Sequence, residues 1–250
     1  MEKFDHRERL MLAGLYLSKF DEEALGALGF ATFTEAFNVL AAALAARPAS
    51  INNYRDEFDP VFPNSRRGWH RRPMRQHCKN LLDRFGDLGL AEMTILLKAT
   101  IRDEGEVDNV PTEHIDDDLE DNSSSFAKRL MTGQAAEQYF RNHYQTIEQF
   151  QGAVLQDTTQ MGCGFDFKLT TPDSYFGVEV KGLSEPAGSV TFTAKEHAVA
   201  NRLQDRYFLF VVRNFKELPY HSIHQNPLGN ALVFSRVETA IIQVSWRASV

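Results

Sequence analysis

Residues 164–183, GFDFKLTTPDSYFGVEVKGL, carry charged side chains inside what otherwise reads as a hydrophobic β-hairpin. Asp166 lies between two phenylalanines, and Glu179 and Lys181 alternate with valines. Bringing such charges toward a core costs free energy unless they are paired or bind a cation. The pattern therefore predicts two strands whose charges serve a purpose other than packing.

The alternation of side chains along a strand predicts which of these residues share a face. A turn near residues 172–173 would bring Asp166 close to Glu179 on one face of the hairpin. Two carboxylates a few ångströms apart repel, and each raises the proton affinity of the other unless a cation lies between them. The predicted charged face holds Tyr175, Gly177, Glu179 and Lys181 of the second strand, and the apolar face holds Phe176, Val178 and Val180.

A hard divalent ion such as Mg²⁺ explains the two carboxylates. It binds one or two of them and completes its shell with water, backbone carbonyl and phosphate oxygens. Lys181, one strand step beyond Glu179, could orient or help deprotonate a metal-bound water and stabilise charge developing on phosphorus. These are the groups needed to hydrolyse a phosphodiester, and Mn²⁺ could replace Mg²⁺.

The surrounding segments predict a helix, three strands, a helix and a strand in that order. A helical run covers 126–150, and Thr193 with Glu196 forms a capping box that begins a second helix. Residues 207–215 are nearly all apolar, which is typical of a strand buried on both faces. The strand-like segments are 153–159, 165–171, 174–183 and 207–215, with 231–237 and 240–246 as further expected strands.

The spacing D-x12-ExK within this α-β-β-β-α-β order resembles the PD-(D/E)xK nuclease superfamily, the fold of many restriction endonucleases. More closely, the chain is similar over roughly residues 130 to 215 to the domain at the C-terminus of plant NO VEIN proteins, widespread in bacterial restriction and phage-defence proteins. The segments that carry this resemblance are 133–137, 164–166, 175–182, 193–196 and 205–212.

The resemblance implies a restriction-endonuclease-like αβββαβ core, an α/β fold with a mixed sheet. It also implies that Asp166 and Glu179 are metal ligands, with Val180 beside them, and that Lys181 is the catalytic lysine. Glu137 matches the acidic residue that many members carry on the first helix, where it assists the metal or its water.

Three other interpretations remain open. The Glu179–Lys181 pair could be a surface cross-strand network on an antiparallel sheet. The domain could keep the nuclease fold without activity, as a nucleic-acid-binding module. It could also be the nuclease subunit of a larger defence complex that requires a partner ATPase.

Residues 1–101 read as a small helical domain, because apolar residues recur at three- and four-residue spacing in 10–20 and 33–48. Pro48 is expected to end the second of these helices and Ser50 to cap a third, which runs to Pro60. The tight turn between them resembles a helix-turn-helix, although simply packed helices give the same pattern. Further helices are expected over 73–85 and 91–101.

The stretch 65–79, SRRGWHRRPMRQHCK, is densely basic and contains no acid. Arginines bind phosphates and guanine edges, and aromatic residues stack on bases, so this stretch is a candidate DNA-binding loop; a solvated loop is the alternative. The candidate contacts in this stretch are Arg66, Arg67, Trp69, His70, Arg71, Arg72 and Arg75, and the separate segment 53–58 could add Asn53, Tyr54 and Arg55.

The stretch 102–125 is almost entirely acidic and polar, which predicts a flexible linker. Alternatively, it could mimic nucleic acid and occupy the basic loop. We therefore expect three regions: a helical, DNA-recognising domain over 1–101, the linker over 102–125, and the nuclease domain over 126–250.

The bulk composition is that of an ordinary cytoplasmic protein, with 43% hydrophobic residues and a net charge of −7. No run approaches the roughly 18 to 20 apolar residues that span a bilayer, so no membrane is expected. The two cysteines lie far apart and form no CxxC motif, so they suggest neither a zinc finger nor a disulfide framework. The sequence thus predicts a Mg²⁺-dependent endonuclease of restriction or phage defence that acts on double-stranded DNA. We expect a homodimer, since cutting both strands usually takes two centres, with a defence-system protein as a possible partner.

Overall fold

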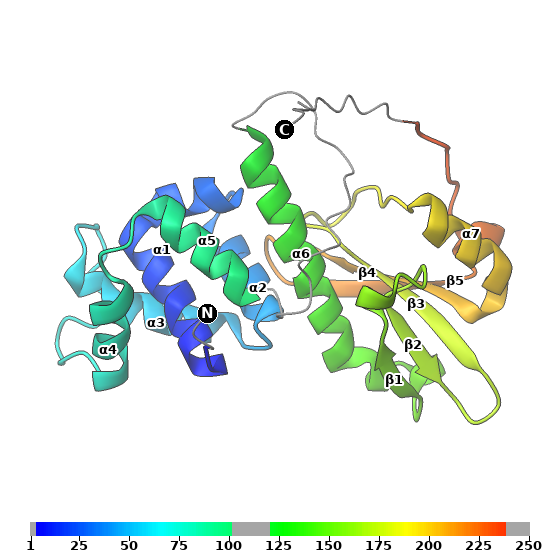
Figure 1. Ribbon diagram of the computed structural model, residues 1–250, viewed down its shortest axis with the longest axis horizontal. Coiled ribbons are helices and arrows are strands. Elements are labelled where there is room, and N and C mark those ends of the chain that lie inside the picture. Colours follow the sequence, from blue (N-terminus) through cyan, green and yellow to red (C-terminus); the bar gives the residue numbers. More distant parts are fainter. Residues whose placement is uncertain (1–3, 102–120, 239–250) are drawn as a thin grey trace, which may run out of the picture.

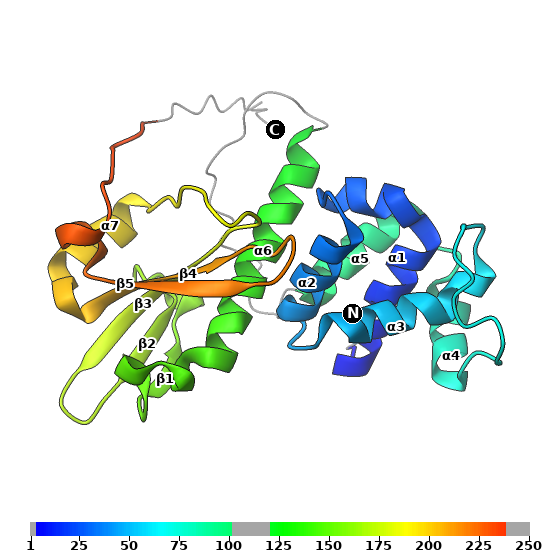
Figure 2. The same ribbon diagram turned by 180° about the vertical axis from the view of Figure 1, so that it is seen from behind.

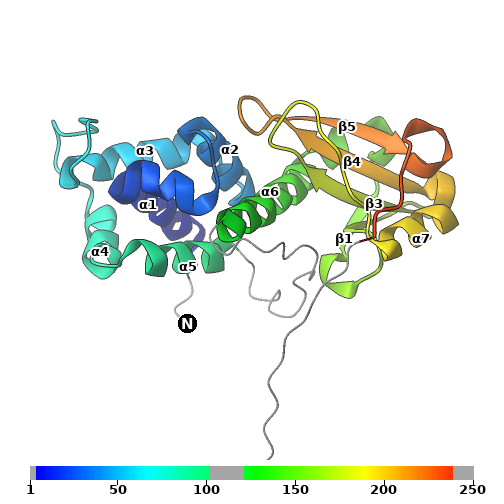
Figure 3. The same ribbon diagram turned by 90° about the horizontal axis from the view of Figure 1, so that it is seen from above.

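The computed structural model describes residues 4–101 and 121–238. The chain forms a mixed α+β structure in which a group of N-terminal helices packs beside a five-stranded mixed sheet (Figure 1). The long helix α6 (Asp121–His143) lies between the N-terminal helices and the sheet in all three views (Figures 1, 2 and 3).

The N-terminal helices surround α1, whose central residues are fully buried. A capping box between Asp5 and Glu8 begins α1, and Gly29, with φ of +74°, ends it in the left-handed conformation that glycine adopts without strain. Gly14 allows α3 to approach closely, because a Cβ there would lie 2.5 Å from Cβ of Tyr54. The helices are α1 (His6–Leu28), α2 (Phe33–Ala43), α3 (Pro48–Phe58), α4 (Gln76–Phe85) and α5 (Leu90–Ile101).

Among the helices of the described residues, none taken singly has the length and apolarity to cross a bilayer. Only α1 and α2 taken together, bent by 84° at their junction, would pass on length and composition.

The C-terminal part contains the predicted α-β-β-β-α-β order and one more strand. Its sheet has the order β1-β2-β3-β4-β5, in which β3 and β4 are parallel and all other neighbours are antiparallel. Its elements after α6 are β1 (Val154–Asp157), β2 (Phe167–Thr170), β3 (Tyr175–Gly182), α7 (Ala194–Leu203), β4 (Tyr207–Arg213) and β5 (Tyr220–Gln225). Short helical turns occupy Asp59–Val61, Tyr144–Thr146, Glu148–Phe150, Thr159–Met161 (η4), Gln204–Arg206 (η5) and Pro227–Ala231 (η6).

Helices α6 and α7 cover the two faces of the sheet (Figures 1 and 3). On the α6 face, the ring of Phe140 lies 5.1 Å from that of Phe167 and 4.9 Å from that of Phe210. On the α7 face, a smaller cluster includes Val199 and Tyr207. Strand β4 is therefore buried on both sides, as its apolar run predicts.

The N-terminal helices and the sheet region share one apolar cluster, and polar contacts join them as well. Lys128 of α6 lies 2.7 Å from the buried carboxylate of Glu35 in α2. The side-chain amide of Asn38 donates to the backbone oxygens of Phe215 and Glu217, at 2.8 and 2.7 Å. The two parts therefore pack directly on each other, and their division into domains stays a prediction.

Several expected boundaries were wrong. Pro48 lies in the first turn of α3, where a proline has no N–H to lose, and Arg47 rather than Ser50 is the N-cap. The helix expected from Pro73 begins at Gln76.

Two expectations about segments also changed. Residues 121–125, expected in the linker, belong to α6. The expected strand over 231–237 does not form in its described residues, whereas β5 forms at Tyr220–Gln225. Residues 102–120 of the linker and the expected strand 240–246 lie outside the described residues.

Candidate active site

The β2–β3 hairpin brings together the charges that its sequence predicted. Phe167 pairs with Val178, and the N–H of Asp166 donates to the carbonyl of Val178 at 3.0 Å, which extends the pairing by one residue. Asp166 and Glu179 therefore lie opposite each other on the same face of the hairpin. The turn between the strands is closed by a hydrogen bond from the N–H of Thr171 to the carbonyl of Ser174, at 2.9 Å.

The carboxylate of Asp166 takes the place of a strand partner. Asp166 directly precedes β2, and its Oδ2 accepts a hydrogen bond at 2.8 Å from the N–H of Val180 in β3. Burial raises the pKa of Asp166 to about 6, although the charge of Lys181 and the Val180 N–H both favour its ionised form.

Glu179 is 3% exposed, and its Oε1 lies 2.7 Å from the ammonium group of Lys181. Burial, followed by the nearby charge of Asp166, raises the pKa of Glu179 well above its ordinary value. The two carboxylates therefore oppose each other's ionisation.

Lys181 lies between two carboxylates, since its Nζ is also 3.1 Å from Oε2 of Glu196 in α7. Burial disfavours the ammonium, but Glu179 and Glu196 outweigh this and raise the pKa of Lys181. The lysine is therefore protonated at neutral pH. Glu196 is also the capping residue of α7, where its Oε2 accepts from the N–H of Thr193 at 2.9 Å.

Glu196 was predicted only as a capping residue, and its contact with Lys181 was missed. The capping box places this glutamate in the first turn of α7. Only the packing of α7 over the charged face of the hairpin brings it to Lys181. The local motif thus contained the residue but not its second partner.

The fully ionised site holds three carboxylates, Asp166, Glu179 and Glu196, against the single ammonium of Lys181. Oδ1 of Asp166 and Oε2 of Glu179 accept no hydrogen bond from the described residues. In the part of the chain that the structure describes, no three His, Cys, Asp or Glu side chains group as a metal site. An ion here would have two carboxylate ligands, with the carbonyl of Val180, whose N–H points to Asp166, as a possible backbone ligand.

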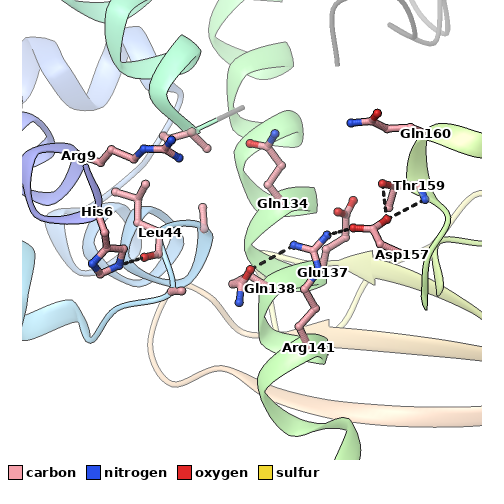
Figure 4. A pocket seen from close by; sticks show the side chains of 13 residues that line it. His6, Arg9, Leu44, Gln134, Glu137, Gln138, Arg141, Asp157, Thr159 and Gln160 are labelled. Atoms are coloured by element: carbon pink, nitrogen blue, oxygen red, sulfur yellow. Dashed lines mark hydrogen bonds and ion pairs between the residues drawn. The ribbon is translucent and has the colours of Figure 1, made fainter. Parts of the chain in front are cut away.

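Glu137, expected in the same site, lines a cavity of about 340 Å³ between the N-terminal helices, α6 and η4 (Figure 4). Its neighbours there include Arg141, which pairs with Asp157 at 2.5 Å. This cavity is on the α6 side of the sheet, whereas Glu179 and Lys181 face α7. The two regions are electrostatically linked, because the charge of Asp157 contributes to the raised pKa of Asp166.

Of the basic stretch 65–79, residues 76–79 belong to α4. The remaining residues, 65–75, form the basic loop, which packs around buried acids. Glu57, 3% exposed, accepts from Nε of Arg75 at 2.6 Å and from Arg72 at 3.1 Å. Asp59, 1% exposed, accepts two hydrogen bonds from Arg66, each of 3.0 Å. Three of the arginines expected to contact DNA therefore neutralise acids of their own chain.

The other candidate contacts differ in their surroundings. The guanidinium of Arg55 lies 5.0 and 4.8 Å from the rings of two phenylalanines of α2, which holds it in the protein. Arg72 stacks 4.3 Å from the ring of Trp69. Asn53, Arg67, His70 and Arg71 are exposed, and within the described residues Arg67 and Arg71 have no ion-pair partner.

The basic loop lies far from the hairpin site. It projects from the end of the molecule that carries α3 and α4, whereas α7 lies at the opposite end (Figures 1 and 3).

The fold and site define a mixed α+β protein with a buried carboxylate pair and a lysine beside it. The model of the family described as "Protein NO VEIN, C-terminal" matches residues 136–224, roughly a third of the chain. This match includes Asp166, Glu179, Lys181 and Glu196. No curated protein and no solved structure matches the chain. The similarity to the NO VEIN C-terminal domain is thus confirmed, and membership of the PD-(D/E)xK superfamily stays a prediction.

Proposed function

We propose that the protein is a Mg²⁺-dependent endodeoxyribonuclease with a restriction-endonuclease-like core that acts in restriction or phage defence. The observation that supports this most directly is the placement of Asp166 opposite Glu179, with Lys181 paired to Glu179 on the same face. The match to the NO VEIN family loosely favours a nuclease-like, defence-related domain.

The residues of the site fit a divalent cation. Asp166 and Glu179 carry raised pKa values because they are buried together, and their excess negative charge is only partly offset by Lys181. Both would hold the ion through their free oxygens, with Val180 contributing its carbonyl. When bound, Mg²⁺ or Mn²⁺ lowers the pKa of a water and neutralises charge on the phosphate.

The chain's own groups would then orient the reactants. The ammonium of Lys181, held between Glu179 and Glu196, can donate to a phosphate oxygen or to the attacking water and stabilise the charge that develops on phosphorus. Because Glu179 and Glu196 raise the pKa of Lys181, it is an ammonium group in the metal-free protein. We therefore assign it an electrostatic role.

A plasmid cleavage assay with Mg²⁺ or Mn²⁺ tests the proposal. Wild type should cleave, and Asp166→Ala and Lys181→Ala should each lose at least about 100-fold in rate, in line with the loss of one preorganised charge. Arg129→Ala, which removes an exposed positive charge of α6, is the matched control and should cleave normally.

Undiminished cleavage by Lys181→Ala would contradict the proposal. If neither wild type nor any variant cleaved the plasmid, an inert nucleic-acid-binding module would be favoured. Cleavage restored by a partner ATPase would instead identify the protein as a subunit of a larger complex. Cutting both strands at one site calls for two centres, so sedimentation of the active species should give a dimer.

A further inference from the structure

Two cations converge on one aromatic ring beside the carboxylate site. Nζ of Lys168 lies 5.0 Å from the ring centroid of Tyr175, and Cζ of Arg206 lies 5.4 Å from it. They come from different elements, since Lys168 is in β2 and Arg206 is in η5, just before β4.

Lys168 shares the face of the hairpin that carries the carboxylates. It pairs with Gly177 and is two residues from Asp166, a step of about 6.6 Å along a strand. Gly177 presents no side chain there, and a Cβ at this position would lie 2.7 Å from the ring of Phe165. The hairpin face beside the two acids is therefore apolar apart from the ammonium group of Lys168.

Neither cation has an ion-pair partner in the described part of the chain, unlike the arginines that neutralise buried acids in the basic loop. The acid nearest to Arg206 in sequence, Asp205, accepts a hydrogen bond at 3.1 Å from the side chain of Asn226. With no acid paired to either cation in the described residues, an anionic group of a ligand can bind to each of them.

A third cation lies at the other end of the site. Lys195 precedes Glu196 in the first turn of α7, and its Nζ is 3.4 Å from where a Cβ of Gly162 would be. Lys168 thus lies on one side of the carboxylate pair, at Gly177, and Lys195 on the other, at Gly162 and Gly164, which precede Asp166. Positive groups flank the acids along the direction of the strand.

We propose that Lys168, Arg206 and Lys195 bind successive phosphates of a DNA backbone that lies across the Asp166–Glu179 pair. This inference rests on the proposed function and specifies where its substrate binds. Each phosphate neutralised by a lysine or arginine releases condensed counterions, so such contacts supply affinity that is independent of sequence.

The test is the salt dependence of duplex binding, measured by fluorescence anisotropy in EDTA so that no cleavage occurs. Lys168→Ala combined with Arg206→Ala should reduce the slope of log K against log salt by about 1.8, because each lost contact contributes about 0.9. Arg47→Ala combined with Arg129→Ala removes the same charge from exposed positions on other elements and should leave the slope unchanged. The glutamine versions of the test pair should reproduce the effect if alanine perturbs the fold.

The outcomes separate this inference from the proposed function. A slope equal to that of wild type overturns the phosphate contacts, even if plasmid cleavage shows that the protein is a nuclease. A reduced slope without any metal-dependent cleavage supports the contacts and contradicts the nuclease. Absence of duplex binding by wild type at low salt overturns the contacts directly.

Discussion

Asp166→Asn should stabilise the metal-free protein at neutral pH, although it removes a proposed metal ligand. Asp166 is partly buried, and desolvation raises its pKa to about 6 against an ordinary 3.8. Asparagine has nearly the same shape and no charge. Its side-chain oxygen can still accept the N–H of Val180, which donates to Asp166 at 2.8 Å.

The magnitude follows from the two pKa values. Above about pH 6, Asp166 is ionised in both the folded and the unfolded protein, and the folded state bears a cost of about 3 kcal/mol. As the pH falls through 6, the folded carboxyl takes up a proton, and below about 3.8 the cost is gone. The asparagine side chain of the variant would be neutral throughout, so Asp166→Asn should gain about 2–3 kcal/mol at pH 7.5 and almost nothing near pH 4.

Urea unfolding in EDTA, followed by far-ultraviolet circular dichroism at several pH values, measures this difference. Asp157→Asn is the matched control, because hydrogen bonds from Thr159 and the charge of Arg141 outweigh burial and lower the pKa of Asp157. That variant should lose stability at neutral pH. Saturating Mg²⁺ should stabilise wild type by about 2.7 kcal/mol at 100 times its Kd and leave Asp166→Asn nearly unchanged. An Asp166→Asn variant that is destabilised equally at every pH would refute the reasoning.

Three further predictions concern the other charged groups. Arg67→Ala with Arg71→Ala should weaken DNA binding without changing the free energy of unfolding, since both are exposed. By contrast, Glu57→Ala should cost about 2–3 kcal/mol in urea unfolding, below the 3–5 of a fully buried pair because its arginines are partly exposed; equal unfolding free energies would show that the loop does not need this acid. Glu196→Gln should keep α7 capped, whereas Glu196→Ala should lower the free energy of unfolding by about 1 kcal/mol. Glu196→Ala should also slow cleavage, because it releases Lys181. Identical cleavage rates of the two variants would contradict this effect on cleavage.

Much of the C-terminal architecture follows from local sequence patterns. Alternating side chains predicted β2, β3 and the face that gathers Asp166 and Glu179, because a strand has only two faces and the turn between them is short. The capping box of Thr193 and Glu196 marked the start of α7. The apolar run of β4 reflects burial between two helical layers, which the structure contains.

The elements that were missed depend on contacts between distant segments. Strand β5 contains His221, Ser222 and His224, whose polarity hides a strand that forms only because β4 offers it an edge. The ring of His221 stacks 4.7 Å from that of Phe210, so this polar residue packs against the core as an apolar one would. No local sequence pattern predicts such a strand pairing.

The basic loop shows the same limit for charge. A run of arginines without an acid predicts an open positive surface, but the acids that neutralise it come from α3 and the turn after it. Glu57 and Asp59 are close in sequence to the loop, yet only their burial distinguishes them from solvated carboxylates. The free charge of the loop is therefore smaller than its composition suggests, and it rests on Arg67 and Arg71.

Glu196 joins these two kinds of information. As a capping residue it is predictable from four letters of sequence, and as the partner of Lys181 it depends on where α7 packs. One oxygen of this carboxylate accepts from both the Thr193 N–H and Lys181, so the start of the helix and the position of the lysine cannot vary independently. A change that frays the first turn of α7 would displace the carboxylate of Glu196 and, with it, the ammonium group of Lys181 that lies beside Glu179. The ionisation of Glu179 is already opposed by burial. The stability of a single helix end is thereby tied to the electrostatics of the candidate active site.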